Sequence, residues 1–201
     1  MKNLLQTLCG LFLVVFYSSC MNSGDNRVDV LIVGGGASGV TSGIQAARMG
    51  ANTLILEETT WLGGMLTSAG VSAVDGNYRL PAGLWGEFKN RLSDYYGGLD
   101  SLKTGWVSNV LFEPSVGNKI FHEMVSAEKN LKVWKQTRLE EVKRVGDEWI
   151  AKVNVEGQGM KTVRSKVMID ATELGDVAKM CGVGYDLSLI HISEPTRHSL
   201  I

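Results

Sequence analysis

Two apolar runs, separated by a helix-like repeat, stand out at residues 28–56. Residues 28–33 are apolar at almost every position, which is typical of a parallel strand buried on both faces. Residues 38–49 place apolar side chains three or four positions apart, as an amphipathic helix does, and Gly50 ends the repeat. Residues 53–56 form a second apolar run. The pattern therefore predicts a βαβ unit.

Downstream, the spacing of the apolar residues changes twice. Apolar spacing predicts helices over 84–96 and 113–128, and a short apolar run at 131–134 predicts a third parallel strand. Alternation with a period of two then predicts three short strands joined by glycine-containing turns, and a further apolar strand and a short helix follow. These five segments are 139–145, 149–155, 160–165, 167–169 and 174–181.

This order of elements predicts an α/β fold. It indicates a Rossmann-like FAD-binding domain of the glutathione-reductase type, in which an antiparallel β-meander interrupts the parallel sheet. A plain NAD-binding domain usually continues as alternating strands and helices without such a meander.

A glycine motif follows the first strand. In Gly34-x-Gly36-x-x-Gly39, the first glycine permits a tight turn, the second lets the backbone approach a pyrophosphate, and the third lets the helix pack closely on the strand. Ala37 and Ser38 then begin a helix whose free N–H groups and positive dipole end favour phosphate. The motif predicts dinucleotide binding.

An acid ends the second strand. Glu57 lies 23 residues after Gly34, near the spacing of about 20 at which a carboxylate accepts from a ribose hydroxyl. The same carboxylate would repel a 2′-phosphate, which disfavours NADP. The motif and the acid alone leave NAD and FAD open.

Five stretches between Asp29 and Val183 carry a family resemblance. They are DVLIVGGGASG, LILEE, WLGGMLTSAG, FEPSVGNKIFHEM and VMIDATELGDVAKMCGV. The chain resembles FAD-dependent oxidoreductases related to the flavin subunit of heterodisulfide reductase. The resemblance implies FAD as cofactor, a small-molecule organic substrate and a separate electron acceptor whose identity is unknown. It leaves the catalytic residues unknown, because most substrate contacts in this family come from a C-terminal half that follows.

The resemblance also implies cofactor contacts. The loop that contains Gly63 and Gly64 and continues into Met65 passes over the FAD in such flavoproteins, and a side chain at either glycine would clash with it. The backbone at the position of Leu139 often meets the adenine ring in relatives. The run Asp170-Ala171-Thr172 resembles a segment beside the adenosine half, although relatives often have glycine where Glu173 stands.

Metal binding is not expected. Relatives in the heterodisulfide reductase branch carry iron–sulfur clusters, but this chain has only 3 cysteines and no C-x-x-C pair. Whether sequence beyond this chain carries such a cluster is left open.

The N-terminal residues indicate export. Residues 1–20 have a positive start at Lys2 and an apolar stretch that is short for a membrane span, and they end in small residues before Cys20. This resembles a bacterial lipoprotein signal with Cys20 as the acylated residue, although Tyr17 departs from the usual pattern. An ordinary signal peptide and an uncleaved anchor are the alternatives. Polar residues 21–27 indicate a tether, so we expect a protein held by lipid on a membrane of the bacterial cell envelope.

The C-terminal residues 187–201 break the preceding pattern. LSLIHISEPTR resembles the translation of a sequencing adapter, so we expect an incomplete FAD-binding domain at 28–186 followed by an artefact. His191 and His198 are therefore excluded as catalysts.

Several other residues could have either a chemical or a structural role. His122 is more often a satisfied helix histidine than a catalyst, and Cys181 among apolar neighbours favours packing over a redox role. Asp75 and Glu87 are more often solvated acids than substrate contacts. Pocket lining and core burial are equally compatible with three tryptophans, Trp61, Trp85 and Trp106.

The net charge of the chain argues against one class of partner. The chain has 20 Lys+Arg and 21 Asp+Glu, for a net charge of −1, which leaves no electrostatic footprint for nucleic acid. The leading interpretation is a FAD-dependent oxidoreductase. An NAD-binding dehydrogenase and a non-catalytic flavin-binding electron-relay module are the alternatives.

Overall fold

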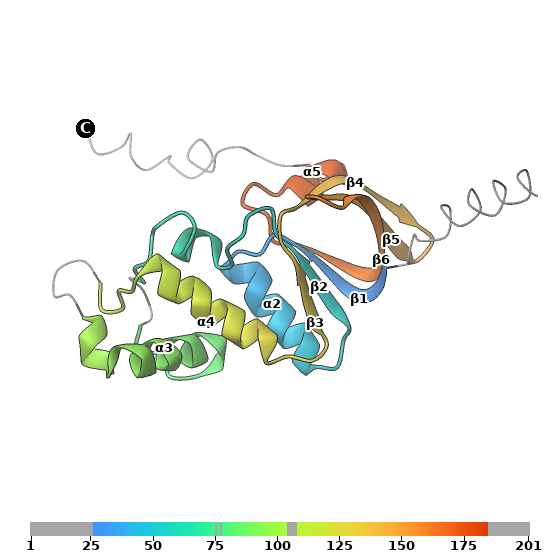
Figure 1. Ribbon diagram of the computed structural model, residues 1–201. Helices are drawn as coiled ribbons and strands as arrows, with labels where there is room; N and C mark the ends of the chain where they lie inside the picture. Colours follow the sequence, from blue (N-terminus) through green and yellow to red (C-terminus); the bar gives the residue numbers. More distant parts are fainter. Residues whose placement is uncertain (1–25, 75, 77, 104–107, 185–201) are drawn as a thin grey trace, which may run out of the picture.

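The computed structural model describes residues 26–74, 76, 78–103 and 108–184. In this part of the chain six strands form one mixed sheet in the order β3-β2-β1-β6-β5-β4 (Figure 1). The strands are β1 (Asn26–Val33), β2 (Thr53–Leu56), β3 (Leu131–Trp134), β4 (Thr137–Val145), β5 (Glu148–Val155) and β6 (Gly159–Asp170). The helices are α2 (Ala37–Arg48), α3 (Gly83–Tyr96), α4 (Pro114–Ser126) and α5 (Asp176–Met180), with 3₁₀ turns η1 (Gly64–Leu66) and η2 (Leu99–Leu102).

The parallel half of the sheet is buried on both faces. β1 pairs in parallel with β2 and β6, and β2 pairs in parallel with β3. Ile32 packs into the core on the helical side, whereas Leu31 and Val33 pack into a second core on the other side. Two-sided burial explains why β1 and β2 are continuous apolar runs rather than alternating ones.

Helices α2, α3 and α4 lie on one side of the sheet, whereas α5 packs beside β4 and β6 on the other (Figure 1). Helices α2 and α4 lie against the parallel strands, and α3 lies beyond α4, farther from the sheet (Figure 1). Aromatic rings join α3 to its neighbours: Phe88 stacks on Phe121 with ring centroids 4.4 Å apart and meets Phe112 edge-on at 5.5 Å. Such contacts add to the area burial that holds α3 in place.

The meander forms the other layer. Strands β4, β5 and the first half of β6 run antiparallel, and their buried side chains, including Ala151, Val153 and Val163, pack with Leu31 and Leu54. The predicted α/β fold with an antiparallel β-meander is confirmed.

One predicted boundary is wrong. The chain does not stop between residues 165 and 167, because β6 is a single strand of 12 residues. It pairs with β5 as far as Ser165 and with β1 as far as Asp170. Lys166 and Val167 are exposed where the β5 partner ends, so the apolar alternation fails while the strand continues. The last helix is also shorter than expected, since α5 begins at Asp176.

Two further observations concern the ends. In the part that the structure describes, no helix has the length and apolar character needed to cross a membrane. The predicted signal, residues 21–25 of the tether and the adapter-like tail lie outside the described residues. The predicted end of the tether is wrong, because Asn26 and Arg27 belong to β1 and pair with β6.

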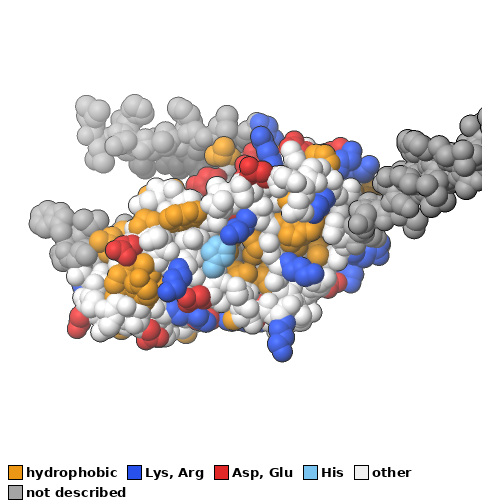
Figure 2. Space-filling view, viewed as in Figure 1, with side chains coloured by type: hydrophobic (Ala, Val, Ile, Leu, Met, Phe, Trp, Pro, Cys, Tyr) orange, Lys and Arg blue, Asp and Glu red, His pale blue; other side chains and the backbone are white. Residues whose placement is uncertain are grey.

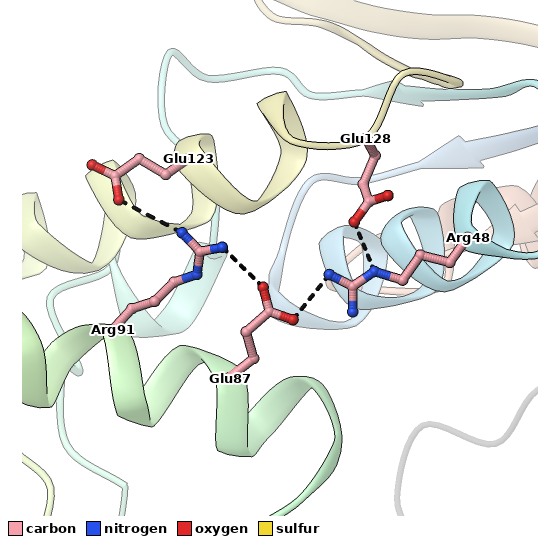
Figure 3. Close-up of polar contacts among 5 residues, drawn as sticks. All are labelled: Arg48, Glu87, Arg91, Glu123 and Glu128. Carbon is pink, nitrogen blue, oxygen red and sulfur yellow. Dashed lines mark hydrogen bonds and ion pairs between the residues drawn. The ribbon is translucent and has the colours of Figure 1, made fainter.

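An ion-pair network ties α2 to α3 and to the end of α4 (Figure 3). Arg48 donates to Glu128 at 2.7 Å and to Glu87 at 2.9 Å, and Arg91 donates to the other oxygen of Glu87 at 3.1 Å. Burial acts to raise the pKa of Glu87, but hydrogen bonds from both arginines outweigh it and the pKa is lowered. Glu87 therefore has a structural role, away from the glycine motif.

We expect Glu87→Gln to lower the free energy of unfolding by about 1 kcal/mol at pH 7, because the network loses its central charge. A lowered folded-state pKa gives stability that is present above the ordinary value of 4.5 and is lost as pH falls through the folded value. The deficit should therefore shrink below about pH 4.5 in urea titrations. Glu141→Gln, which breaks an exposed pair with Lys152, is the control. An equal loss in both variants would contradict the network's role.

Candidate functional site

The glycine motif makes a turn with no room for side chains at two of its positions. Gly34 has φ +103°, and a Cβ atom there would lie 2.3 Å from the carbonyl oxygen of Ala171. A Cβ atom on Gly39 would lie 1.9 Å from the carbonyl oxygen of Gly34. Both distances are far shorter than any real contact, so Gly34 and Gly39 are required by the fold itself: the first by the turn and the second by the approach of α2.

Gly36 is different. Its φ of −63° and ψ of 179° suit any residue, and a Cβ atom there would meet no atom within 4 Å. Gly36 is also the N-cap of α2, and no side chain caps the helix at this point. A helix N-terminus of this kind favours an anion through its backbone N–H groups and its dipole. Gly36 thus faces open space where a ligand anion is favoured.

A pocket of about 280 Å³ lies at the carboxyl ends of the parallel strands. This edge is where open α/β sheets bind ligands. It brings together seven of the predicted residues: Gly34, Gly36, Glu57, Gly64, Leu139, Ala171 and Thr172. Its other lining residues are Val33, Leu56, Glu58, Thr59, Ser68, Thr137, Glu173 and Asp176.

The remaining predicted residues lie outside this lining. Ala37 and Ser38 form the first turn of α2, and Gly39 is buried behind the Gly34 turn. Gly63 is buried under the loop, whereas Met65 is 54% exposed beside Gly64. Cofactor contact by each of these residues stays a prediction.

Glu57 is held by two backbone donors. The N–H of Gly35 donates to one carboxylate oxygen at 2.7 Å, and the N–H of Thr59 donates to the other at 2.8 Å. Each oxygen keeps a further lone pair, so the carboxylate can still accept from a ligand hydroxyl. A Cβ atom on Gly35 would lie 2.7 Å from the carboxylate, so Gly35 must also be glycine. The sequence motif did not identify this third requirement, because it comes from the contact with Glu57 in the folded chain.

The double-glycine loop lies directly against the Gly36 turn. The N–H of Gly63 donates to the carbonyl oxygen of Gly35 at 2.8 Å, and Gly63 and Gly36 form a parallel bridge. A Cβ atom on Gly64 would lie 3.0 Å from the Cα of Gly36. Both loop glycines have positive φ, 106° and 53°. The loop and the turn together form a narrow cradle of bare backbone, here called the Gly36–Gly64 cradle.

The end of β6 closes another side of the pocket. Asp170 accepts from the N–H and the hydroxyl of Thr172 at 3.0 and 2.6 Å, and from the N–H of Ala178 at 2.9 Å. The hydroxyl oxygen of Thr172 accepts from the N–H of Asp176 at 2.8 Å. These bonds cap α5 and fix Thr172 and Asp176 at the pocket wall. Asp176 was not among the predicted site residues. It follows a turn at Gly175, which has φ +70°, and the sequence alone did not indicate that this turn lies at the pocket.

Among the described residues, the other candidates for chemistry do not line the pocket: His122, Cys181, Glu87, Trp61 and Trp85. Figure 2 shows a histidine, coloured pale blue, at the surface, and His122 is the only histidine among the described residues. Burial, with a smaller effect of Lys135, lowers the pKa of His122 against a hydrogen bond with the Thr60 backbone. The expected packing role of Cys181 is wrong, because this cysteine is exposed. Trp85 packs against Phe88.

Two further candidates, Asp75 and Trp106, lie outside the described residues. Within residues 26–74, 76, 78–103 and 108–184, no group of three or more metal-ligating side chains occurs.

These observations fit part of a dinucleotide. A Cβ at Gly36 would project into open space where a pyrophosphate requires bare backbone, and the helix end that faces it has no side-chain cap. Glu57 stands at the same pocket with acceptor capacity for a ribose. The pocket volume of about 280 Å³ lies just below the usual range for small-molecule sites, which suits part of a dinucleotide rather than the whole.

Known structures share this fold. A flavoprotein/dehydrogenase from Cytophaga hutchinsonii matches with a TM-score of 0.58 and 15% identity, over 78% of this chain and 42% of that one. The p-nitrophenol 4-monooxygenase PnpA from Pseudomonas putida DLL-E4 matches at 0.54 and 14%, over 80% and 45%. The anhydrotetracycline hydroxylase OxyS from Streptomyces rimosus matches at 0.56 and 14%, over 78% and 34%. The chain therefore spans less than half the length of each of these three proteins.

The sequence itself matches a family. No curated protein matches the chain. The family model described as FAD dependent oxidoreductase matches residues 29–194, which include the whole cradle and pocket. The chain therefore belongs to the FAD dependent oxidoreductase family, and its cofactor is FAD.

Proposed function

We propose that this chain is the cofactor-binding part of an enzyme that oxidises or reduces a small organic substrate, with FAD held in the Gly36–Gly64 cradle. The observation that carries the proposal is the open space in front of Gly36, next to an uncapped helix N-terminus. Family membership supports the redox chemistry, and FAD supplies that chemistry when bound.

Each predicted residue has a role in this proposal. The backbone of Gly36 and the N–H groups of Ala37 and Ser38 receive the pyrophosphate. Glu57 accepts from a ribose hydroxyl, and its two backbone donors hold the carboxylate in one orientation. The β4 residues Thr137 and Leu139 line the adenine side.

The flavin side is formed by the loop. The bare backbone of Gly63 and Gly64 lets the cofactor run past the cradle, and the exposed Met65 extends the same surface. Gly39 acts through the fold by letting α2 approach Gly34. Within the described residues these groups bind and orient the cofactor, and the substrate contacts are assigned to sequence outside this chain.

The relation to the flavin subunit of heterodisulfide reductase belongs to this proposal. Its support is the set of five motifs between Asp29 and Val183. It implies a separate electron acceptor that receives electrons from the bound cofactor.

The location is also proposed. We infer that the protein is exported and held by lipid at Cys20 on a membrane of the bacterial cell envelope. Support comes from the apolar stretch before Ser18, Ser19 and Cys20, and from the polar residues 21–25 that would serve as a tether before β1 begins.

Gly36→Val should fold normally and bind FAD on the order of a hundredfold more weakly. The backbone at Gly36 suits valine and a Cβ there meets no protein atom within 4 Å, so the side chain is expected to obstruct the ligand rather than the fold. Circular dichroism checks the fold, and flavin fluorescence quenching gives the affinity. Gly76→Val, at another glycine whose Cβ meets nothing, is the matched control. Unchanged FAD binding by Gly36→Val would place the phosphates elsewhere.

The full-length protein from its host should be yellow, release FAD on denaturation and catalyse dye reduction by a small organic donor. The family's cofactor and the complete cradle are the reasons. A screen of donors under anaerobic conditions, followed at the flavin absorbance, makes the measurement. Flavin that exchanges electrons with redox dyes but with no organic substrate would favour the relay module. Colourless protein that takes up NAD and not FAD would favour the dehydrogenase.

Cys20→Ser should move the protein from the membrane fraction to the soluble fraction, or leave its signal uncleaved, because serine cannot be acylated through a thioether. Cell fractionation and mass spectrometry of the mature N-terminus measure both outcomes. Cys9→Ser, inside the apolar stretch, is the matched control and should remain in the membrane fraction. A wild-type protein that is already soluble and carries no acyl group would overturn the lipoprotein proposal.

A further inference from the structure

The distance between the double-glycine loop and the Gly36 turn determines the width of the cradle. Gly63 and Gly64 both have positive φ, and the loop contacts the turn through one short bridge. Glycine backbone loses more conformational freedom on ordering than any other residue. A loop built on two glycines therefore needs other contacts to keep its place.

Thr67 supplies one such contact from within the loop. Its side chain is buried, and its hydroxyl donates to the carbonyl oxygen of Leu62 at 2.6 Å. The bond closes the loop across Gly63 and Gly64. The methyl group of Thr67 also packs against Gly63, since it lies 2.7 Å from the place where a Cβ on Gly63 would be.

Asn118 supplies a second contact from α4. Its side-chain oxygen accepts from the N–H of Leu62 at 2.9 Å. Both backbone polar groups of Leu62 are thus bonded to side chains, the N–H to Asn118 and the carbonyl to Thr67. Leu62 is itself fully buried, and the Phe121 ring lies against Gly63 from the same helix. The loop is anchored at its start, immediately before the two glycines.

We propose that Thr67 and Asn118 are positioning residues for FAD, which hold the Gly63–Gly64 loop at the Gly36 turn before the cofactor arrives. The proposal rests on the proposed function, because it takes the cradle as the pyrophosphate site. A loop that is already ordered loses little entropy on binding, so the two anchors increase affinity without touching the cofactor.

The test uses the full-length protein, stripped of FAD. Thr67→Val keeps the shape of the side chain and removes the donor, and Asn118→Leu removes the acceptor. Thr67→Ser restores the hydroxyl. Thr53→Val is the matched control, because Thr53 is equally buried and its hydroxyl also donates to a backbone carbonyl, that of Ala51 at 3.2 Å. Thr53 is the first residue of β2, whereas the last residue of that strand, Leu56, lines the pocket.

Two readouts separate positioning from general stability: the FAD dissociation constant from flavin fluorescence, and the melting temperature of the FAD-free protein. Thr67→Val and Asn118→Leu should raise the dissociation constant about fivefold or more, the effect of one lost hydrogen bond. Thr67→Ser should bind FAD almost as wild type does. Thr53→Val should lower the melting temperature and leave the dissociation constant unchanged.

Distinct outcomes overturn the two proposals. Wild-type FAD affinity in Thr67→Val and Asn118→Leu, with Gly36→Val impaired, would overturn the positioning role and leave the site intact. An equal loss of affinity in Thr53→Val would also overturn it, because any softening of the fold would then suffice. Wild-type affinity in Gly36→Val would overturn the site itself. If Thr67→Val does not fold, Asn118→Leu and Thr67→Ser decide the result.

Discussion

The close approach of helix α2 to the end of β1 is the constraint on which the rest of the structure depends. It is possible only because Gly39 has no side chain: a Cβ atom there would lie 1.9 Å from the carbonyl oxygen of Gly34. Gly34 in turn lies against the backbone of Ala171, so the ends of β1, β6 and α2 meet at one point. The pocket opens there because three backbones converge without side chains between them.

The parts of the fold that the sequence predicted are those determined by neighbours along the chain. The bounds of β2 and β3 agree with the apolar runs: β2 is buried at all four positions, and β3, at the edge of the sheet, still buries Leu131 against the helical side. The unity of β6 could not be predicted, since its second half remains a strand through pairing with β1, more than a hundred residues earlier in the sequence. The exposure of Cys181 was missed for a related reason: its apolar neighbours in sequence do not cover it in the fold.

The candidate site divides in the same way. Gly34, Gly36, Gly39 and Glu57 follow a local spacing, so the sequence could place them on one turn and one strand end. Gly35 and Asn118 could not be found in that way. The need for glycine at position 35 comes from the Glu57 carboxylate, and Asn118 acts on a backbone N–H that lies 56 residues away. Contacts across such separations arise from tertiary packing and leave no periodic signal.

Electrostatics explains why bare backbone matters so much in the proposed site. Among the residues that line the described pocket there are four acids, Glu57, Glu58, Glu173 and Asp176, and no lysine or arginine. A pyrophosphate there would gain nothing from a neighbouring cationic side chain in this lining. Its charge would instead be met by the N–H groups and dipole of α2, whose effect falls off within the first turn of the helix. Such short-range stabilisation would require the phosphate to lie almost against the backbone, and the absence of side chains at Gly36 and Gly64 would then be what allows it to bind.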